Sequence, residues 1–222
     1  MTAPGLVAKV GGLAPEKVET MEFLVTMTTR VPDGTSGQAV DDVKAREAVH
    51  SAELAAQGQL IRLWRPPLAP GEWRSLALFA ADNADHLETV LASMPLRIWR
   101  TDEVTPLAAH PNDPAVPGRA PLAVEYLVTM TIDVPDGTPE ATVADTEARE
   151  ADRAAILAGQ GHLMRLWTLP PRSGHSRTLG LWSADDATGM QAVLASLPLY
   201  NWMTIITTPL SPHPSDPSLA HP

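Results

Sequence analysis

Two glutamates, Glu47 and Glu150, lie on the apolar side of the helices that the sequence predicts around them. At about 100° per residue, Glu47 falls beside Val43, and Glu150 shares its helix face with Val143. A carboxylate between a helix and a sheet is costly to bury, and burial raises its pKa toward neutrality. Such a group suits general acid–base catalysis. The alternative is a glutamate at the helix margin that pairs with an arginine or reaches water.

The two glutamates have different neighbours on their helices. Lys44 precedes Glu47 by about one helical turn and is placed to hold that carboxylate ionised. Glu147 takes the same position before Glu150, and two carboxylates so close raise at least one pKa. We therefore expect the two glutamates to titrate differently.

A short strand places an arginine near the first glutamate. Side chains alternate along a strand, so Ile61, Leu63 and Arg65 are predicted to share the face under the helices. Arg65 then lies at the rim of the pocket that Glu47 faces, where it can bind a substrate carboxylate through two hydrogen bonds. The second half of the chain has Thr168 at this position and lacks that contact.

The opposite face of the same strand carries an arginine and a tryptophan in both halves of the chain. Arg62 with Trp64, and Arg165 with Trp167, are predicted to face the space between two sheets, where they are candidates for substrate binding. The simpler interpretation is that each pair packs there through a cation–π contact.

Other kinds of catalytic site have no support in the sequence. The chain has no cysteine, and its seven histidines show no H-x-x-x-H or H-E-x-x-H spacing. Nucleophile-elbow and nucleotide-binding motifs of the types G-x-S-x-G, Walker A and G-x-G-x-x-G do not occur either. We therefore expect neither a metal ion nor a cofactor.

The chain is a duplication. EFLVTMTTRVPDGT begins at Glu22 and EYLVTMTIDVPDGT at Glu125, an offset of 103, and this offset aligns roughly half of the positions without a gap. The sequence predicts an N-terminal extension (1–20), a first domain (21–110), a Pro- and Gly-containing linker (111–123), a second domain (124–213) and a loose tail (214–222).

Each copy is predicted to fold as strand, helix, strand, strand, helix, strand. In the first copy the strands are predicted at 22–30, 60–65, 73–79 and 97–105, and the helices at 38–57 and from an Asp82 cap to just before Pro95. This order is the ferredoxin-like plan, whose open sheet face needs a cover. We therefore predict an α+β fold of two tandem ferredoxin-like (βαββαβ) domains packed sheet to sheet as an intramolecular dimeric α+β barrel.

The composition of the chain argues against nucleic acids and membranes as binding partners. The 222 residues are 44% hydrophobic and carry a formal net charge of −10, which disfavours binding to nucleic acid. No apolar run approaches the roughly 18 residues of a membrane helix, and residues 1–20 lack the apolar core of a secretory signal. We expect a cytoplasmic protein without membrane contacts.

The order and spacing of these motifs resemble the muconolactone Δ-isomerase family. The resemblance rests on the xFLVxMT strand, the KAREA-type helix, the LWR strand, the S-x-P-L turn and the closing HP. It implies a ferredoxin-like fold, paired barrels within larger oligomers, and a cofactor-independent proton shift in an unsaturated lactone. It also implies that Glu47 and Glu150 take the position of the family's helix glutamate, with Lys44 and Arg65 as the companion cations of the first.

This chain departs from the family's pattern in three ways. Arg62 and Arg165 stand where a histidine is expected, the loop between Arg65 and Trp73 is longer, and two copies are fused in one chain. The departures bear on the substrate more than on the chemistry. The second copy, which lacks both companion cations, is expected to be a degenerate site that completes the barrel.

Three functions follow as hypotheses. The first is a cofactor-independent isomerase that shifts a double bond in an unsaturated lactone or related carbonyl compound. The second is a cofactor-free cyclase or isomerase that tailors a secondary metabolite such as a polyketide. The third is a non-catalytic module that binds a small ligand. In each case the partner is a small molecule and the chain is its own pseudo-dimer, with further homo-oligomerisation left open.

Overall fold

The computed structural model describes residues 20–114 and 122–219, and within them the same elements are built twice. The first half contains β1 (Met21–Thr29), α1 (Gly37–Ala56), β2 (Leu60–Arg65), β3 (Arg74–Ala81), α2 (Ala84–Ser93), the 3-10 helix η1 (Pro95–Trp99) and β4 (Arg100–Ala109). The second half contains β5 (Val124–Ile132), α3 (Glu140–Gly159), β6 (Leu163–Arg172), β7 (His175–Ala184), α4 (Ala187–Ala195), η2 (Tyr200–Trp202), β8 (Met203–Pro212) and η3 (Pro217–Leu219). Nearly all of the predicted extension (1–20), the centre of the predicted linker (111–123) and the last three residues of the predicted tail (214–222) lie outside the described residues.

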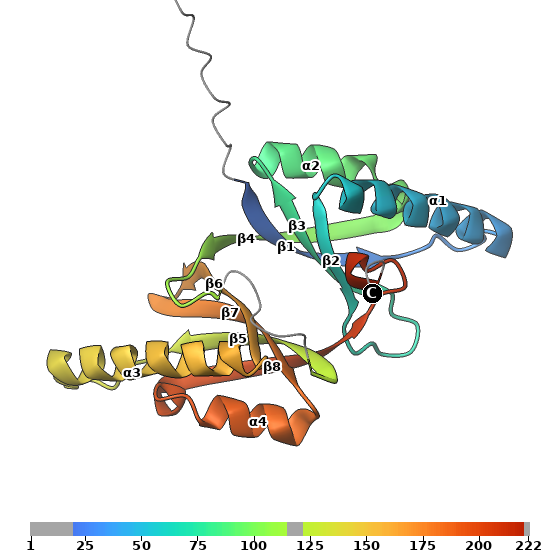
Figure 1. Cartoon of the computed structure of the whole chain (residues 1–222). Helices are drawn as coiled ribbons and strands as arrows, with labels where there is room; N and C mark the ends of the chain where they lie inside the picture. The colour runs from blue at the N-terminus through green and yellow to red at the C-terminus, as the bar shows by residue number, and fades with distance from the viewer. Residues whose placement is uncertain (1–19, 115–121, 220–222) are drawn as a thin grey trace, which may run out of the picture.

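Within the described residues, eight strands form one closed barrel in the order β1-β3-β2-β8-β5-β7-β6-β4. Two antiparallel pairs join the halves, because β8 of the second half pairs with β2 and β4 of the first half pairs with β6. The helices lie outside the barrel, with α1 and α2 over the first half and α3 and α4 over the second (Figure 1). The predicted intramolecular dimeric α+β barrel is confirmed.

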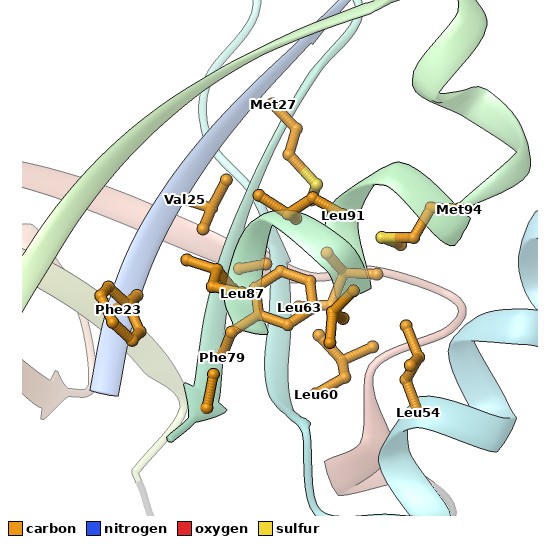
Figure 2. Close-up of a cluster of buried hydrophobic side chains, with 13 residues drawn as sticks. Phe23, Val25, Met27, Leu54, Leu60, Leu63, Phe79, Leu87, Leu91 and Met94 are labelled. Carbon is orange, nitrogen blue, oxygen red and sulfur yellow. The ribbon is translucent and has the colours of Figure 1, made fainter. Parts of the chain in front are cut away.

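Three apolar clusters follow from the alternation of side chains along the strands. In the first half, side chains of β1, β2 and β3 pack against side chains of α1, α2 and the residue after α2 (Figure 2). The cluster includes Phe23, Val25, Met27, Leu60, Leu63 and Phe79 from the strands and Leu54, Leu87, Leu91 and Met94 from the helical side. The second half repeats this arrangement. The third cluster fills the barrel between the halves and includes Trp64, Leu76, Leu78, Leu107, Leu127, Met164, Trp167, Leu179, Leu181 and Leu210. None of the helices in the described ranges has the length and apolar character needed to cross a membrane.

The helix that carries Glu47 has clear boundaries in the sequence. Ser36 accepts a hydrogen bond from the backbone N–H of Ala39 and caps the first turn of α1. Gly58 follows the last turn with a φ of 72°, a left-handed conformation that favours glycine. The predicted helix 38–57 therefore agrees with the observed one to within one residue at each end.

Two local predictions were wrong in the segment that follows β3. Asn83, rather than Asp82, caps α2, because its side chain accepts from the backbone N–H of His86 while Asp82 contacts the His86 ring. The fourth strand begins at Arg100 instead of residue 97, since the residues from Pro95 to Trp99 form the 3-10 helix η1. This change of boundary matters for the site, because it places Arg100 at the first position of β4.

The side chains of β2 do not face the sides that strict alternation predicted, because the strand contains a β-bulge. The register of β2 against β3 shifts between Leu60 and Arg62, so one extra residue is accommodated there. Leu60 therefore joins Leu63 under the helices, and Ile61 packs against the inter-sheet cluster instead. The second half has the same shift between Leu163 and Arg165. Strict alternation had placed Ile61 with Leu63.

The predicted loose tail is ordered over its described part. Residues 214–219 follow β8 and end in η3, which packs on β2 of the first half. Asp216 has a fully buried side chain that pairs with Arg62 and accepts from the backbone N–H of Leu63 at 3.3 Å. The C-terminal segment of the second half is thus part of the first half's structure (Figure 1).

Candidate active site

A cavity of about 490 Å³ lies in the first half between α1, the sheet and the C-terminal segment. Its polar lining comes from α1, β1, β2, β3 and β4, and from the segment after β8: Thr29, Lys44, Glu47, Ser51, Arg65, Arg74, Ser75, Arg100, His213 and Ser215. Its apolar lining includes Met27, Leu60, Leu63, Leu68, Trp73, Phe79, Met94 and Leu96. The volume falls in the range of sites for small organic molecules.

Glu47 forms part of the wall of this cavity and is held at both carboxylate oxygens. Oε2 accepts the backbone N–H of Leu96 at 2.8 Å, and Oε1 accepts from Nη1 of Arg100 at 3.1 Å. The side chain is only 13% exposed, and burial raises its pKa even though both donors act to lower it. Glu47 is therefore buried on the predicted face of its helix, and it also pairs with an arginine, as the alternative interpretation of the sequence expected.

Arg100 is the cation at Glu47, and the sequence analysis missed it. Its side chain is 2% exposed, donates from Nη2 to Oδ2 of Asp102 at 3.1 Å, and lies with Nε 2.6 Å from Oδ1 of the same carboxylate. Asp102 also pairs with Arg97, so this carboxylate offsets part of the positive charge near Glu47. The offset of 103 carried a signal for this pair, because Met203 and Ile205 occupy the corresponding positions of the second half.

Lys44 and Arg65 line the same cavity without bonding to Glu47. The Nζ atom of Lys44 lies 5.2 Å from the centroid of the Trp73 ring and 3.7 Å from a carboxylate oxygen of Asp41. Arg65 lies at the cavity edge beside His213, where its charge acts on the imidazole. The structure thus brings both predicted cations to the cavity, while Arg100 takes the position at Glu47 that was expected of Lys44.

The second half contributes the other side of this cavity. His213, Pro214 and Ser215 line it, although the chain reaches them only after β8. Burial and the charge of Arg65 lower the pKa of His213 to about 4, so the ring is neutral near pH 7. In the sequence, His213 belongs to the closing His-Pro pair, whose counterpart in the first half is His110.

Glu150 has only part of these surroundings. Its Oε2 accepts the backbone N–H of Leu199 at 3.0 Å, and Met203 stands where the first half has Arg100. Burial raises the pKa of Glu150. The neighbouring carboxylate of Glu147, which was expected to raise it further, is not among the causes of this shift.

The second half has a larger aromatic side chain, Trp182, at a position that lines the cavity of the first half. It occupies the position of Phe79, a residue that lines the first-half cavity, and its indole lies over Gly180. A Cβ atom on Gly180 would overlap Nε1 of Trp182, so the glycine makes room for the indole. Its counterpart in the first half is Ala77, beside the smaller Phe79.

Gly180→Ala is expected to lower the free energy of unfolding by about 1–3 kcal/mol, because the added methyl group must displace the fully buried Trp182. Urea denaturation followed by tryptophan fluorescence measures the change. Gly159→Ala is the matched control, since nothing lies within 4 Å of its added Cβ and the free energy should change little. Equal effects of the two substitutions would contradict the packing argument.

The predicted Arg–Trp pairs lie away from the cavity that contains Glu47. Arg62 donates to Glu125 at 2.9 and 2.7 Å and to Asp216, and Nε1 of Trp64 donates to Glu125 at 2.8 Å. The guanidinium lies 4.8 Å from the centroid of the Trp64 ring. These contacts cross from one half to the other. We call the group formed by Arg62, Trp64, Glu125 and Asp216 the Arg62 clamp.

The pseudo-symmetric group around Arg165 repeats these contacts. Arg165 donates to Glu22 and Asp113, Trp167 donates to Glu22, and the guanidinium lies 4.8 Å from the Trp167 ring. Arg165 and Trp167 also border an outer cleft of about 1060 Å³ near the junction of β4 and β6. The cation–π contact that the sequence suggested is present in both halves.

Comparison with known proteins identifies relatives that match part of the chain. The chain is 34% identical over 92 residues to a muconolactone Δ-isomerase of Cupriavidus pinatubonensis, a match that covers 41% of this chain and 97% of the relative. It is 33% identical over 92 residues to muconolactone Δ-isomerase 1 of Acinetobacter lwoffii, covering 41% of this chain and 93% of that protein. Each relative is therefore matched along nearly its full length by less than half of this chain.

Solved structures of similar fold cover both halves at once. A heme-binding protein from Thermus thermophilus superposes with a TM-score of 0.57 at 12% identity, over 88% of this chain and 92% of the other. Chlorite dismutase from Candidatus Nitrospira defluvii, in complex with imidazole, gives 0.55 at 9% identity, over 89% and 94%. At these identities the likeness shows the fold alone.

The family model for muconolactone delta-isomerase matches the chain twice, over residues 21–113 and 124–216. Both matches include the closing His-Pro pair and the aspartate that binds the opposite half's arginine. Together the matches span most of the chain, which therefore belongs to the muconolactone Δ-isomerase family as two tandem copies of the family's domain.

Proposed function

We propose that the chain is a cofactor-independent isomerase that moves a proton, and with it a double bond, in an unsaturated lactone or a related carbonyl compound. The strongest support for this proposal is the environment of Glu47. Glu47 is a largely buried carboxyl group with a raised pKa, held by Leu96 and Arg100 on the wall of a cavity that is also lined by three further cationic side chains.

The reaction needs one carboxyl group acting twice. The Glu47 carboxylate takes a proton from a carbon α or γ to the substrate carbonyl, and the electron pair of that C–H bond moves toward the carbonyl oxygen. The protonated Glu47 then returns the proton to a different carbon, so the double bond shifts and no atom is gained or lost. Leu96 and Arg100 hold the carboxyl in one place for both transfers.

Lys44 and Arg65 give the cavity an affinity for an anionic group. In the proposed complex they bind a carboxylate or the carbonyl oxygen of the substrate, and Arg65 offers two parallel N–H donors for this. The second half has Glu147 and Thr168 at these positions. We propose that Glu150 therefore contributes little turnover and that the second half mainly completes the barrel and the first cavity.

Activity is expected to fall as the pH drops through the raised pKa of Glu47, because the protonated carboxyl cannot accept a proton. The acidic limb of kcat/KM should therefore lie above the ordinary glutamate pKa of 4.5. Arg100→Met removes a charge that lowers this pKa, so the limb should move further up. A pH–rate profile of both proteins measures the shift, and a limb that stays in place would show that another group controls it.

A cyclase or isomerase acting on a larger secondary metabolite is the second candidate. The cavity volume of about 490 Å³ and the apolar side chains of Leu68, Trp73 and Phe79 favour a substrate larger than a single lactone ring. A non-catalytic ligand-binding module would bind such a molecule without turnover.

Deuterium incorporation separates these possibilities. The chain is incubated in D₂O with muconolactone and, separately, with a polycyclic carbonyl compound, and exchange is followed by NMR. Exchange and isomerisation of the lactone support the first function, and reaction of the polycyclic compound alone supports the second. Tight binding of either compound, with neither exchange nor isomerisation, would overturn both catalytic proposals.

A further inference from the structure

The C-terminal segment of the second half brings a histidine into the first half's cavity. β8 pairs with β2 at Trp64–Pro212 and Arg65–Ser211, and the backbone N–H of His213 donates to the carbonyl of Leu63 at 3.0 Å. Figure 1 shows this segment, in red, beside β2. His213 is thus attached to the strand that forms the cavity wall.

The position of His213 is held from both sides. Beyond it, the fully buried carboxylate of Asp216 pairs with Arg62 and accepts from the backbone N–H of Leu63. The backbone N–H of Asp216 in turn donates to the carbonyl of His213 at 2.8 Å. A turn fixed at both ends by the same strand keeps its side chain in one orientation, which catalytic donors require.

The hydrogen bonds of the ring determine which nitrogen carries the proton. Nδ1 of His213 accepts the backbone N–H of Ser215 at 3.1 Å, so in the neutral ring the proton is on Nε2. Burial and Arg65 keep the ring neutral at pH 7 by lowering its pKa to about 4. In residues 20–114 and 122–219, no side chain or backbone group forms a hydrogen bond with Nε2.

We propose that His213 donates its Nε2–H to the substrate oxygen on which negative charge develops while Glu47 holds the proton. The inference rests on the proposed function, since it names a second group for the same reaction. The electron pair released by C–H cleavage reaches that oxygen, the His213 proton stays on Nε2, and the pair returns to carbon when Glu47 reprotonates it. A neutral donor stabilises the oxyanion while keeping its own proton.

The proposal gives the second half a direct part in the site of the first. Glu47 comes from α1 of one half and His213 from the segment after β8 of the other. The second half is then needed for catalysis even where its own glutamate does little. A single copy of the domain would have the base and lack this donor.

His213→Gln tests the proposal, with His110→Gln as the matched control. His110 is the counterpart of His213 at the offset of 103, its Nδ1 accepts the backbone N–H of Asn112 at 3.1 Å, and it is absent from the cavity lining. The probe is tetronate, an enolised five-membered lactone that is anionic at neutral pH, and its binding is measured by titration calorimetry. His213→Gln should weaken binding by about 10-fold or more, and His110→Gln should leave it unchanged.

The reaction itself gives a second measurement. His213→Gln should lower kcat for lactone isomerisation by about 10²–10³-fold with little change in KM, because the donor acts on charge that exists only during the reaction. Thermal melting of both variants checks that they fold. If His213→Gln does not fold, His213→Asn is used in its place. In the wild-type protein, ¹⁵N NMR of the histidine rings reads the protonated nitrogen directly.

Each result separates this inference from the proposed function. Equal tetronate binding by His213→Gln and His110→Gln, no binding by the wild-type protein, or a proton on Nδ1 of His213 would overturn the donor. If Glu47→Gln still isomerises the lactone, the acid–base proposal fails, while a specific loss of tetronate binding in His213→Gln still supports the donor. Loss of turnover in Glu47→Gln together with a specific loss of tetronate binding in His213→Gln supports both.

Discussion

Glu47→Gln is expected to reduce turnover by roughly 10²–10⁴-fold, the contribution typical of a positioned acid–base group. The amide keeps the size of the side chain and its oxygen can still accept the backbone N–H of Leu96, but it cannot take a proton. Deuterium exchange or isomerisation of an unsaturated lactone measures the loss. The melting temperature should change little, because the amide also removes a partly buried charge.

Glu150→Gln is the control for this experiment. Its side chain accepts from the corresponding backbone N–H, that of Leu199, and burial also raises its pKa, but Met203 replaces the cation found at Glu47. We expect its turnover to remain close to that of the wild-type protein. Equal losses in the two variants would mean that both halves work, and a larger loss in Glu150→Gln would place the reaction in the second half. If neither variant loses activity, both glutamates are structural.

Arg62→Met is expected to lower the free energy of unfolding by about 3–5 kcal/mol. Arg62 is the cation of its clamp, and removing it leaves the carboxylates of Glu125 and Asp216 buried side by side without that charge. Since these contacts join the two halves, the loss should appear in the unfolding of the whole barrel. Urea denaturation measures it as a lower midpoint.

Arg149→Met provides the comparison for an exposed ion pair. Arg149 pairs with Asp145 on the surface of α3, where both side chains are well exposed, and such pairs contribute at most about 1 kcal/mol. A loss in Arg62→Met no larger than that in Arg149→Met would show that the clamp adds little to stability. That result would instead favour the substrate-binding role that the sequence suggested for Arg62.

The two halves agree in what joins them and differ in what lines their cavities. The Arg62 clamp and the matching group around Arg165 use an arginine, a tryptophan, a glutamate and an aspartate at equivalent positions. Around the glutamates, by contrast, the second half has Glu147, Thr168 and Met203 in place of three cations. A closed barrel needs both junctions at once, whereas the reaction that we propose needs only one complete cavity, which is a physical reason for the difference.

Much of the fold was determined by the sequence itself. The offset of 103 identified the duplication, the alternation in residues 22–30 predicted β1, and Gly58 marked the end of α1. Helical periodicity alone also placed Glu47 on the buried side of its helix. The duplication is read by comparing the two halves of the chain; the other features depend on neighbours within a few residues, so local pattern is sufficient to predict them.

Only the tertiary structure decided how the site is completed. Arg100 reaches Glu47 across 53 positions, and Asp216 reaches Arg62 across 154, so no local pattern reports either contact. The bulge in β2 moved Ile61 to the barrel interior because its register depends on the pairing with β3. Closure of the barrel carried His213 from the end of the second half to the cavity of the first, because the unpaired edge of β8 forms backbone hydrogen bonds with the edge of β2.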